Sequence, residues 1–263
     1  MELNLIRSLG DELFHALRNR STVSPLSQRY PDMTIEDAYH VSAHLLELRR
    51  GASELVVGKK IGVTSEAVQK MLNVHQPDFG FLTDAMRFEN GAEISFSKTG
   101  LIQPRAEGEI AFVLKEDLIS RNITREDVLD ATEAVLPCFE IVDSRIDDWK
   151  IKIQDTVADN ASCGVFVLGV DRVDPRSVDL PNVNLEMYRN GERVASGLGS
   201  AVQGHPAEAV AWLANTLGQF GIPFLAGETI LSGSLVPLIP AQVGDRFELT
   251  ISGIGSASVA FVD

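Results

Sequence analysis

The spacing of apolar residues changes near residue 58, and this change limits the folds that the chain can adopt. Through residue 50 the apolar positions recur every three or four residues, as they do on one face of a helix. They are Leu5, Ile6, Leu9, Leu13, Ala16 and Leu17, then Ile35, Ala38, Val41, Leu45 and Leu48. From Gly58 onward most apolar runs are short and end at turn residues, which is typical of strands. We therefore predict a mixed α+β fold, with a small helical region at residues 1–57 and a large β core at residues 58–263.

Local signals mark the bounds of several expected elements. Capping boxes are predicted at Thr34 with Asp37 and at Thr124 with Asp127, a helix start at His205-Pro206, and a two-residue hairpin turn at Asn190-Gly191. Strands are predicted at residues 109–114, 136–142, 165–168, 185–189, 230–232 and 247–251. In the last of these, apolar and polar residues alternate, so one face of that strand is expected to be buried.

The charge of the chain excludes two classes of partner. The net charge is −14 and the pI is about 4.8, so the basic surface of a nucleic-acid or anionic-membrane binder is missing. A small anionic substrate would be repelled on average, so a local cation would have to attract it. The two cysteines, Cys138 and Cys163, lie beside apolar residues, which indicates buried thiols. With no signal-peptide pattern and no run of bilayer length, the expected location is the cytoplasm.

Three glutamates stand in or beside runs that look buried. Glu107 and Glu109 are two residues apart, so in a strand both side chains project from one face. A solvated strand face would explain this pair, but the apolar run at residues 110–114 favours burial. Glu140 interrupts another apolar run and needs a partner, either an arginine such as Arg145 or a metal ion. Three converging carboxylates would form an all-oxygen site suited to Mg²⁺ or Mn²⁺.

These glutamates also carry a resemblance to a known family. Glu107-Gly108-Glu109 followed by Glu140 resembles the E-x-E…E metal motif of the fumarylacetoacetase-like superfamily. The similarity extends over nearly the whole chain, through the segments at residues 58–65, 76–80, 143–146, 155–162 and 233–235. Lys59-Lys60-Ile61 and the aspartate of Gln76-Pro77-Asp78-Phe79-Gly80 are similar to the hydratase branch of meta-cleavage pathways, whereas the sister decarboxylases have Leu-Lys-Met and lack that aspartate.

The resemblance implies a fold and a set of site residues. The expected fold is a fumarylacetoacetase C-terminal-like mixed β core, a β-roll or sandwich, forming a catalytic domain at residues 58–263. Glu107, Glu109 and Glu140 would bind Mg²⁺ or Mn²⁺. Lys60 and Asp78 would be catalytic, and Asp159, Asn160, Ser162 and Ser234 would bind substrate. Without the resemblance, the methylene chain of Lys60 would be expected to pack on apolar surface with its ammonium in water. Asp78 would be expected in a turn, and residues 155–162 would form a loop or a helix cap.

The resemblance also implies an activity. The expected reaction is metal-dependent hydration of 2-hydroxypenta-2,4-dienoate, by way of its 2-oxo-3-enoate form, to 4-hydroxy-2-oxopentanoate. The metal would chelate the substrate carboxylate and 2-oxygen, while Lys60 and Asp78 act as general acid and base. The alternatives are decarboxylation of a 2-oxo-3-enedioate, or a non-catalytic role as partner of that decarboxylase. Homo-oligomers are expected, with association to a pathway decarboxylase or aldolase as a further expectation.

Overall fold

The computed structural model describes residues 1–64, 69, 74–119 and 122–263. Ser65, the last residue of one motif, lies outside these ranges. The helices are α1 (Leu3–Asn19), α2 (Leu26–Arg29), α3 (Ile35–Gly51), α5 (Phe96–Thr99), α6 (Arg125–Ala131), α7 (Ile153–Ala158) and α8 (Pro206–Gly218). The strands are β1 (Val56–Gly62), β2 (Asp78–Thr83), β3 (Arg87–Glu89), β4 (Ala92–Ser95), β5 (Arg105–Leu114), β6 (Thr132–Val142), β7 (Cys163–Leu168), β8 (Asn184–Arg189), β9 (Glu192–Leu198), β10 (Thr229–Ser234), β11 (Ile239–Pro240), β12 (Arg246–Ile251) and β13 (Gly255–Val262).

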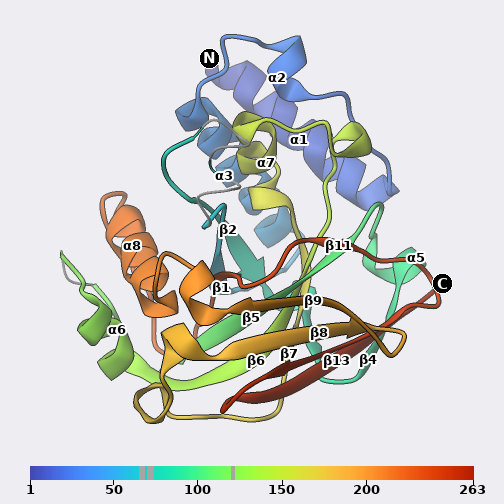
Figure 1. Ribbon diagram of the computed structural model, residues 1–263. Helices are drawn as coiled ribbons and strands as arrows, with labels where there is room; N and C mark the ends of the chain where they lie inside the picture. Colours follow the sequence, from blue (N-terminus) through green and yellow to red (C-terminus); the bar gives the residue numbers. More distant parts are fainter. Residues whose placement is uncertain (65–68, 70–73, 120–121) are drawn as a thin grey trace.

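The strands of the described ranges form two sheets (Figure 1). The larger sheet has the order β2-β1-β10-β5-β6-β7-β3, with β11 paired to β5. The smaller sheet has the order β4-β13-β12-β8-β9. Most neighbours are antiparallel, but β1 pairs with β10 in parallel, Gly58 opposite Thr229. This mixed β core with peripheral helices confirms the predicted α+β class. None of the helices in the described ranges is long and apolar enough to cross a bilayer.

The main apolar core lies between the two sheets. Phe139 of β6 meets Phe247 of β12 edge to face, with ring centroids 6.4 Å apart. Along β5 the side chains alternate, so Ile110 and Phe112 face this core while Ala111 faces a second apolar cluster inside the larger sheet. Gly108 lies where the sheets approach closely, because a β-carbon there would be 2.7 Å from a Leu185 methyl carbon. The alternation therefore leaves the glutamates on the other face of β5.

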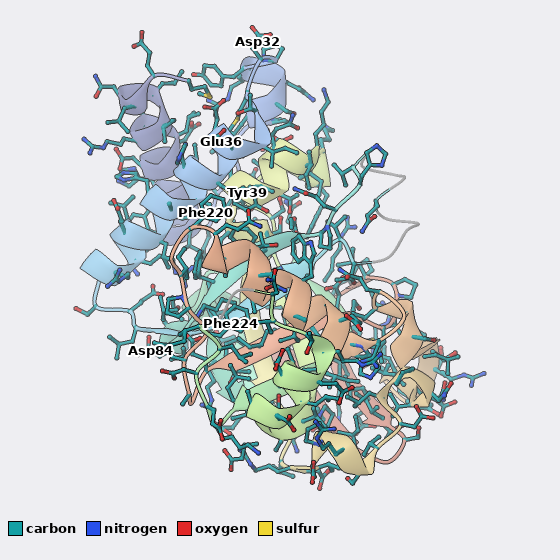
Figure 2. All side chains as sticks on the ribbon, turned by 90° about the vertical axis from the view of Figure 1, so that its left-hand side faces the viewer. Asp32, Glu36, Tyr39, Asp84, Phe220 and Phe224 are labelled. Carbon is teal, nitrogen blue, oxygen red and sulfur yellow. The ribbon has the colours of Figure 1, made fainter. Side chains whose placement is uncertain are left out.

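The N-terminal helices form their own apolar cluster beside the larger sheet (Figure 1). Leu9 and Leu13 of α1 and Val41 of α3 belong to this cluster, which also takes in Val157 of α7. Contacts with the sheet include Tyr39 of α3, which Figure 2 labels. Its ring stacks on Phe79 of β2, with centroids 4.3 Å apart and an angle of 13°. Helices from both sides of residue 58 thus share one core, and the division of the chain at that residue stays a prediction.

Most local predictions are confirmed. Thr34 and Thr124 each accept a hydrogen bond from the backbone three residues on, and each capping box is complete. Asn190 and Gly191 both have positive φ, as a tight hairpin turn between β8 and β9 requires. His205 caps α8 by accepting a hydrogen bond from Ala207 N at 3.0 Å. The burial of β12 alternates as predicted.

Candidate active site

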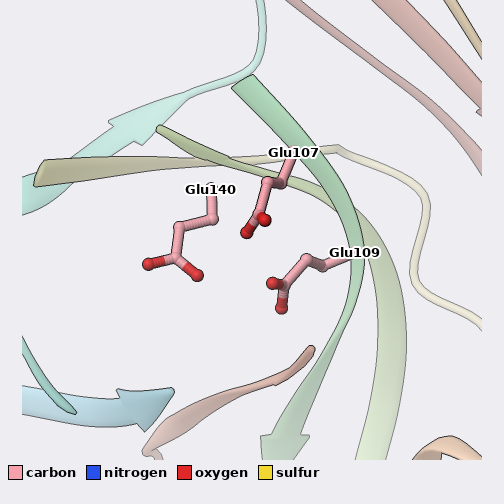
Figure 3. Close-up of side chains that lie close together, drawn as sticks. All are labelled: Glu107, Glu109 and Glu140. Carbon is pink, nitrogen blue, oxygen red and sulfur yellow. The ribbon is translucent and has the colours of Figure 1, made fainter. Parts of the chain in front are cut away.

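Three carboxylates meet on the inner face of the larger sheet. Glu107 lies directly opposite Glu140 in the β5–β6 pairing, and Glu109 follows Glu107 on the same face. One carboxylate oxygen from each of the three lies within 4.8 Å of the others (Figure 3). We call these three residues the glutamate cluster. The strand period therefore brings together the residues that the sequence predicts as metal ligands.

Several oxygens of the glutamate cluster have no hydrogen-bond donor among the described residues. Among the described residues, Glu109 Oε1 and both carboxylate oxygens of Glu140 are buried without a hydrogen bond. Glu109 Oε2 accepts one from Gly233 N at 2.9 Å. Burial, and next the charge of Glu140, raise the pKa of Glu107 to about 8 and the pKa of Glu109 well above its usual range. Buried like charges with unused lone pairs are the donor set that a hard divalent cation would satisfy.

Lys60 and Asp78 lie next to the glutamate cluster. Lys60 Nζ lies 3.1 Å from Glu140 Oε1 as an ion pair without hydrogen-bond alignment. The Lys60 side chain is buried, which opposes its charge, but Glu140 and Asp78 outweigh this and raise the pKa of its ammonium. Burial raises the pKa of Asp78. A β-carbon at Gly62 would lie 2.2 Å from Asp78 Oδ1 and 3.3 Å from Lys60 Nζ, so both groups sit over this glycine.

The polar string at residues 155–162 has two roles in the structure. Asp159 is fully buried and accepts hydrogen bonds from Arg145 N at 2.8 Å and Arg145 Nε at 2.5 Å. Arg145 thus pairs with Asp159, and the suggestion that it pairs with Glu140 was wrong. Asn160 binds both backbone groups of Phe81 on β2, at 2.8 and 2.9 Å.

Two of the four predicted substrate-binding residues line the pocket. The pocket has a volume of about 670 Å³, and Ser162 and Ser234 line it together with Lys60, Asp78 and Glu107. The Ser234 hydroxyl donates to Val236 O at 2.7 Å. Asp159 and Asn160 are not among the lining residues. The assignment of all four residues to substrate binding stays a prediction.

The sequence did not single out two residues that stand in the same pocket. Arg105 and Trp149 line it, and the Arg105 guanidinium carbon lies 4.3 Å from the centroid of the Trp149 ring. A signal existed for Arg105, since it precedes Glu107 by two residues and therefore shares its face of the strand. No local signal marked Trp149, because its position depends on the fold of the segment after β6. Residues 235–238 form the apolar wall of the pocket.

Comparison with known proteins defines the class. The family model of the fumarylacetoacetate (FAA) hydrolase C-terminal region matches residues 56–262. The chain belongs to this family. It is 66% identical over 258 residues to a 2-hydroxyhexa-2,4-dienoate hydratase of Comamonas testosteroni, with 98% of each chain covered. It is 60% identical over 222 residues to a 2-hydroxypent-2,4-dienoate hydratase of Pseudomonas putida, covering 84% of this chain and 100% of the relative.

A solved structure agrees with the fold over the full length. The 4-oxalocrotonate decarboxylase from Pseudomonas putida G7, complexed with magnesium and adipate, superposes with a TM-score of 0.95 at 33% sequence identity. The match covers 100% of this chain and 99% of that structure. The helical N-terminal region is therefore included in the shared architecture.

The stability of the metal-free protein should fall as pH rises from about 5 to about 9. Glu107 and Glu109 have pKa values raised by folding, so they stabilise the fold while protonated and lose that effect as pH passes through their folded pKa, about 8 for Glu107. Saturating Mg²⁺ should add roughly 5–10 °C to the unfolding midpoint, and more at high pH, because fewer protons must leave. Thermal unfolding with chelator and with Mg²⁺ at three pH values would measure this. A Mg²⁺ shift that does not change with pH, or one equal in Glu109→Gln, would contradict it.

Proposed function

We propose that this chain is a metal-dependent hydratase of 2-hydroxy-2,4-dienoates, with 2-hydroxypenta-2,4-dienoate as substrate and 4-hydroxy-2-oxopentanoate as product. The observation that carries the proposal is a pocket lined by Lys60, Asp78 and Glu107, with the other two members of the glutamate cluster next to Glu107. The two relatives at 60–66% identity bear hydratase names, which supports the reaction class. Such a reaction would belong to the meta-cleavage catabolism of aromatic compounds.

The glutamate cluster fits a divalent cation such as Mg²⁺ or Mn²⁺. Its donors are all carboxylate oxygens, and the described residues leave several of them without hydrogen bonds. The related decarboxylase structure contains magnesium. When bound, the cation would bind the substrate carboxylate and 2-oxygen and stabilise negative charge on that oxygen.

The residues of the chain would then move the protons. Lys60 carries a proton that it can donate to the far carbon of the dienol, which converts the substrate to a 2-oxo-3-enoate as the 2-hydroxyl loses its own proton. The proton lost by the 2-hydroxyl would replace the one that Lys60 gave. Asp78 can accept a proton from the water that adds at C4 and pass it to C3, which completes the product. Because Lys60 and Asp78 both lie over Gly62, the two transfers can occur at one end of the substrate. The apolar wall at residues 235–238 would keep bulk water from the conjugated chain.

An absorbance assay of metal-stripped protein tests the proposal. Consumption of 2-hydroxypenta-2,4-dienoate should be absent after chelation and restored by Mg²⁺ or Mn²⁺, and the product should be heavier than the substrate by one water. The six-carbon dienoate should also react, because one methyl group in an apolar pocket changes specificity by only about 1–3 kcal/mol. Full activity after thorough metal removal would contradict the scheme.

A decarboxylase is the second candidate, since the chain superposes closely on 4-oxalocrotonate decarboxylase. The same assay with a 2-oxo-3-enedioate separates the two reactions, because decarboxylation releases CO₂ and adds no water. No turnover alone, with stimulation of an added decarboxylase, would indicate the partner role. Homo-oligomer formation, association with a pathway decarboxylase or aldolase, and the cytoplasmic location stay predictions.

A further inference from the structure

Arg105 and Trp149 form a rigid cationic wall of the pocket. Arg105 is the first residue of β5, where its backbone is held between Val142 of β6 and Pro240 of β11. Its guanidinium stacks over the Trp149 ring at 4.3 Å. The indole is fixed in turn, because Trp149 Nε1 donates to Gln103 O at 2.9 Å. A guanidinium held on an aromatic face loses little freedom when it binds a planar anion.

Among the residues that the structure describes, Arg105 has no anionic partner, unlike the other cations near the site. Lys60 is paired with Glu140, and Arg145 is paired with Asp159. In the described ranges, no carboxylate lies within ion-pair distance of the Arg105 guanidinium, and no hydrogen bond from its side chain is found. Burial lowers the pKa of Arg105, which indicates that the group is partly removed from water. A half-buried guanidinium facing a pocket with its donors unused is suited to binding an anion.

The backbone around Trp149 supports a role in the pocket. Asp148 and Trp149 both have positive φ, 54° and 56°, a conformation that is unfavourable for residues other than glycine. Two consecutive residues in this conformation persist only where the surroundings hold them. Here the strained turn places the indole under Arg105 and in the pocket lining.

We propose that Arg105, stacked on Trp149, binds the carboxylate of the substrate and thereby fixes its direction in the pocket. This inference rests on the proposed function, since it assigns the anionic end of that same substrate. The guanidinium would donate hydrogen bonds to a carboxylate oxygen of the substrate. Arg105 is thus a substrate-binding residue beyond the cluster that would hold the metal.

The order of the strands indicates which way the substrate would lie in the pocket. Asp78 lies on β2 and Lys60 on β1, on one side of β10, whereas Arg105 lies on β5 on its other side. The glutamate cluster, on β5 and β6, is reached by Lys60 from across the curled sheet. A substrate with its carboxylate at Arg105 therefore extends its unsaturated carbons toward Lys60 and Asp78, the groups that would transfer protons.

The charge of the site supports the same assignment. The glutamate cluster and Asp78 together carry four formal negative charges, which Lys60 and a divalent cation would reduce to one. Arg105 brings this sum to zero, and Asp148, which also lines the pocket, is paired with Lys150 at 2.9 Å. A singly charged acid would otherwise enter against a net negative pocket inside a protein of net charge −14.

Binding of a stable analogue tests the inference without turnover. The probe is 2-oxopentanoate, compared with its neutral amide, titrated into Mg²⁺-loaded protein by calorimetry. A Trp212→Phe background leaves Trp149 as the remaining tryptophan, so its fluorescence reports on the pocket directly. The variants are Arg105→Met, Arg105→Lys and, as a matched control, Arg246→Met, whose side chain is 62% exposed on β12.

Arg105→Met should weaken binding of 2-oxopentanoate roughly 10–100-fold, the loss expected for a charge-assisted hydrogen bond. Binding of the amide should change less than about threefold, since a neutral group gains little from the guanidinium. Arg105→Lys should fall between, and Arg246→Met should match wild type. Equal weakening of acid and amide would mean that Arg105 only maintains the pocket, and no weakening of either would also overturn the proposal.

Turnover separates this inference from the proposed function. In an active hydratase, Arg105→Met should raise KM and leave kcat within about threefold, as loss of uniform binding does. Wild-type protein that does not hydrate dienoates but still selects the acid over the amide through Arg105 would refute the hydratase alone. A normal hydratase in which Arg105→Met leaves this selectivity intact would refute the inference alone.

Discussion

Glu109→Gln should lower Mg²⁺-dependent activity roughly a thousandfold or more while stabilising the metal-free protein. The amide keeps an oxygen to accept from Gly233 N, but it replaces an anionic ligand by a neutral one. It also removes the free-energy cost of keeping the Glu109 carboxyl protonated above its ordinary pKa, and it leaves the Lys60–Glu140 ion pair in place. The unfolding midpoint without metal should rise by roughly 2–4 °C, the shift that about 1 kcal/mol gives a chain of this size.

Calorimetric titration with Mg²⁺, kinetics and thermal unfolding on the same preparation would measure the three effects. Glu248→Gln is the matched control, because its side chain is 51% exposed on β12 and makes a surface ion pair with Arg246. It should change none of the three. Retained Mg²⁺ binding in Glu109→Gln, or a less stable metal-free protein, would show that the glutamate cluster is not a cation site.

Asp78→Asn should lower kcat by roughly 10²–10⁴-fold with little change in Mg²⁺ affinity. The carboxylate is buried, faces Lys60, and has an Oδ1 without a hydrogen bond among the described residues, as expected for a group that exchanges a proton with substrate or water. The amide has nearly the same shape but cannot accept that proton. The defect should therefore appear in kcat, and binding of 2-oxopentanoate should stay within about threefold of wild type.

Asp84→Asn provides the control for this variant. Asp84 follows the other end of β2 and is exposed at the surface, where its Oδ1 accepts from Leu55 N at 2.9 Å (Figure 2). An asparagine oxygen can make the same bond, so activity should be unchanged. If Asp78→Asn kept more than about a tenth of the wild-type kcat, Asp78 would not be the proton acceptor, and Lys60 would have to serve both steps.

Local sequence patterns predicted the helices and strands better than they predicted which charged side chains pair with one another. Residue alternation correctly placed Glu107 and Glu109 on one face, because that depends only on the strand period. The partner of Glu140 depends on the curl of the sheet, which brings Lys60 rather than Arg145 to it. Likewise, residues 155–162 show no helical period, yet their first four residues belong to α7, where Val157 is buried in the cluster of the N-terminal helices.

β1 shows why a buried strand can escape detection. Lys59 and Lys60 are adjacent and both are buried, so their side chains point to opposite faces of one strand. Lys59 pairs with Glu228 on one face and Lys60 with Glu140 on the other. Two consecutive lysines would ordinarily indicate exposure, and both partners come from distant strands. No pattern within the segment could identify them, whereas family resemblance did single out Lys60.

The parallel pairing of β1 with β10 has a consequence for biosynthesis. A nascent chain that has emerged through β7 contains every member of the glutamate cluster, together with Lys60 and Asp78, but the strand that separates β1 from β5 does not yet exist. Until residues 229–234 leave the ribosome, β1 and β5 each present an unpaired edge. The site therefore forms late in synthesis, and until then both strand edges are open to incorrect pairing.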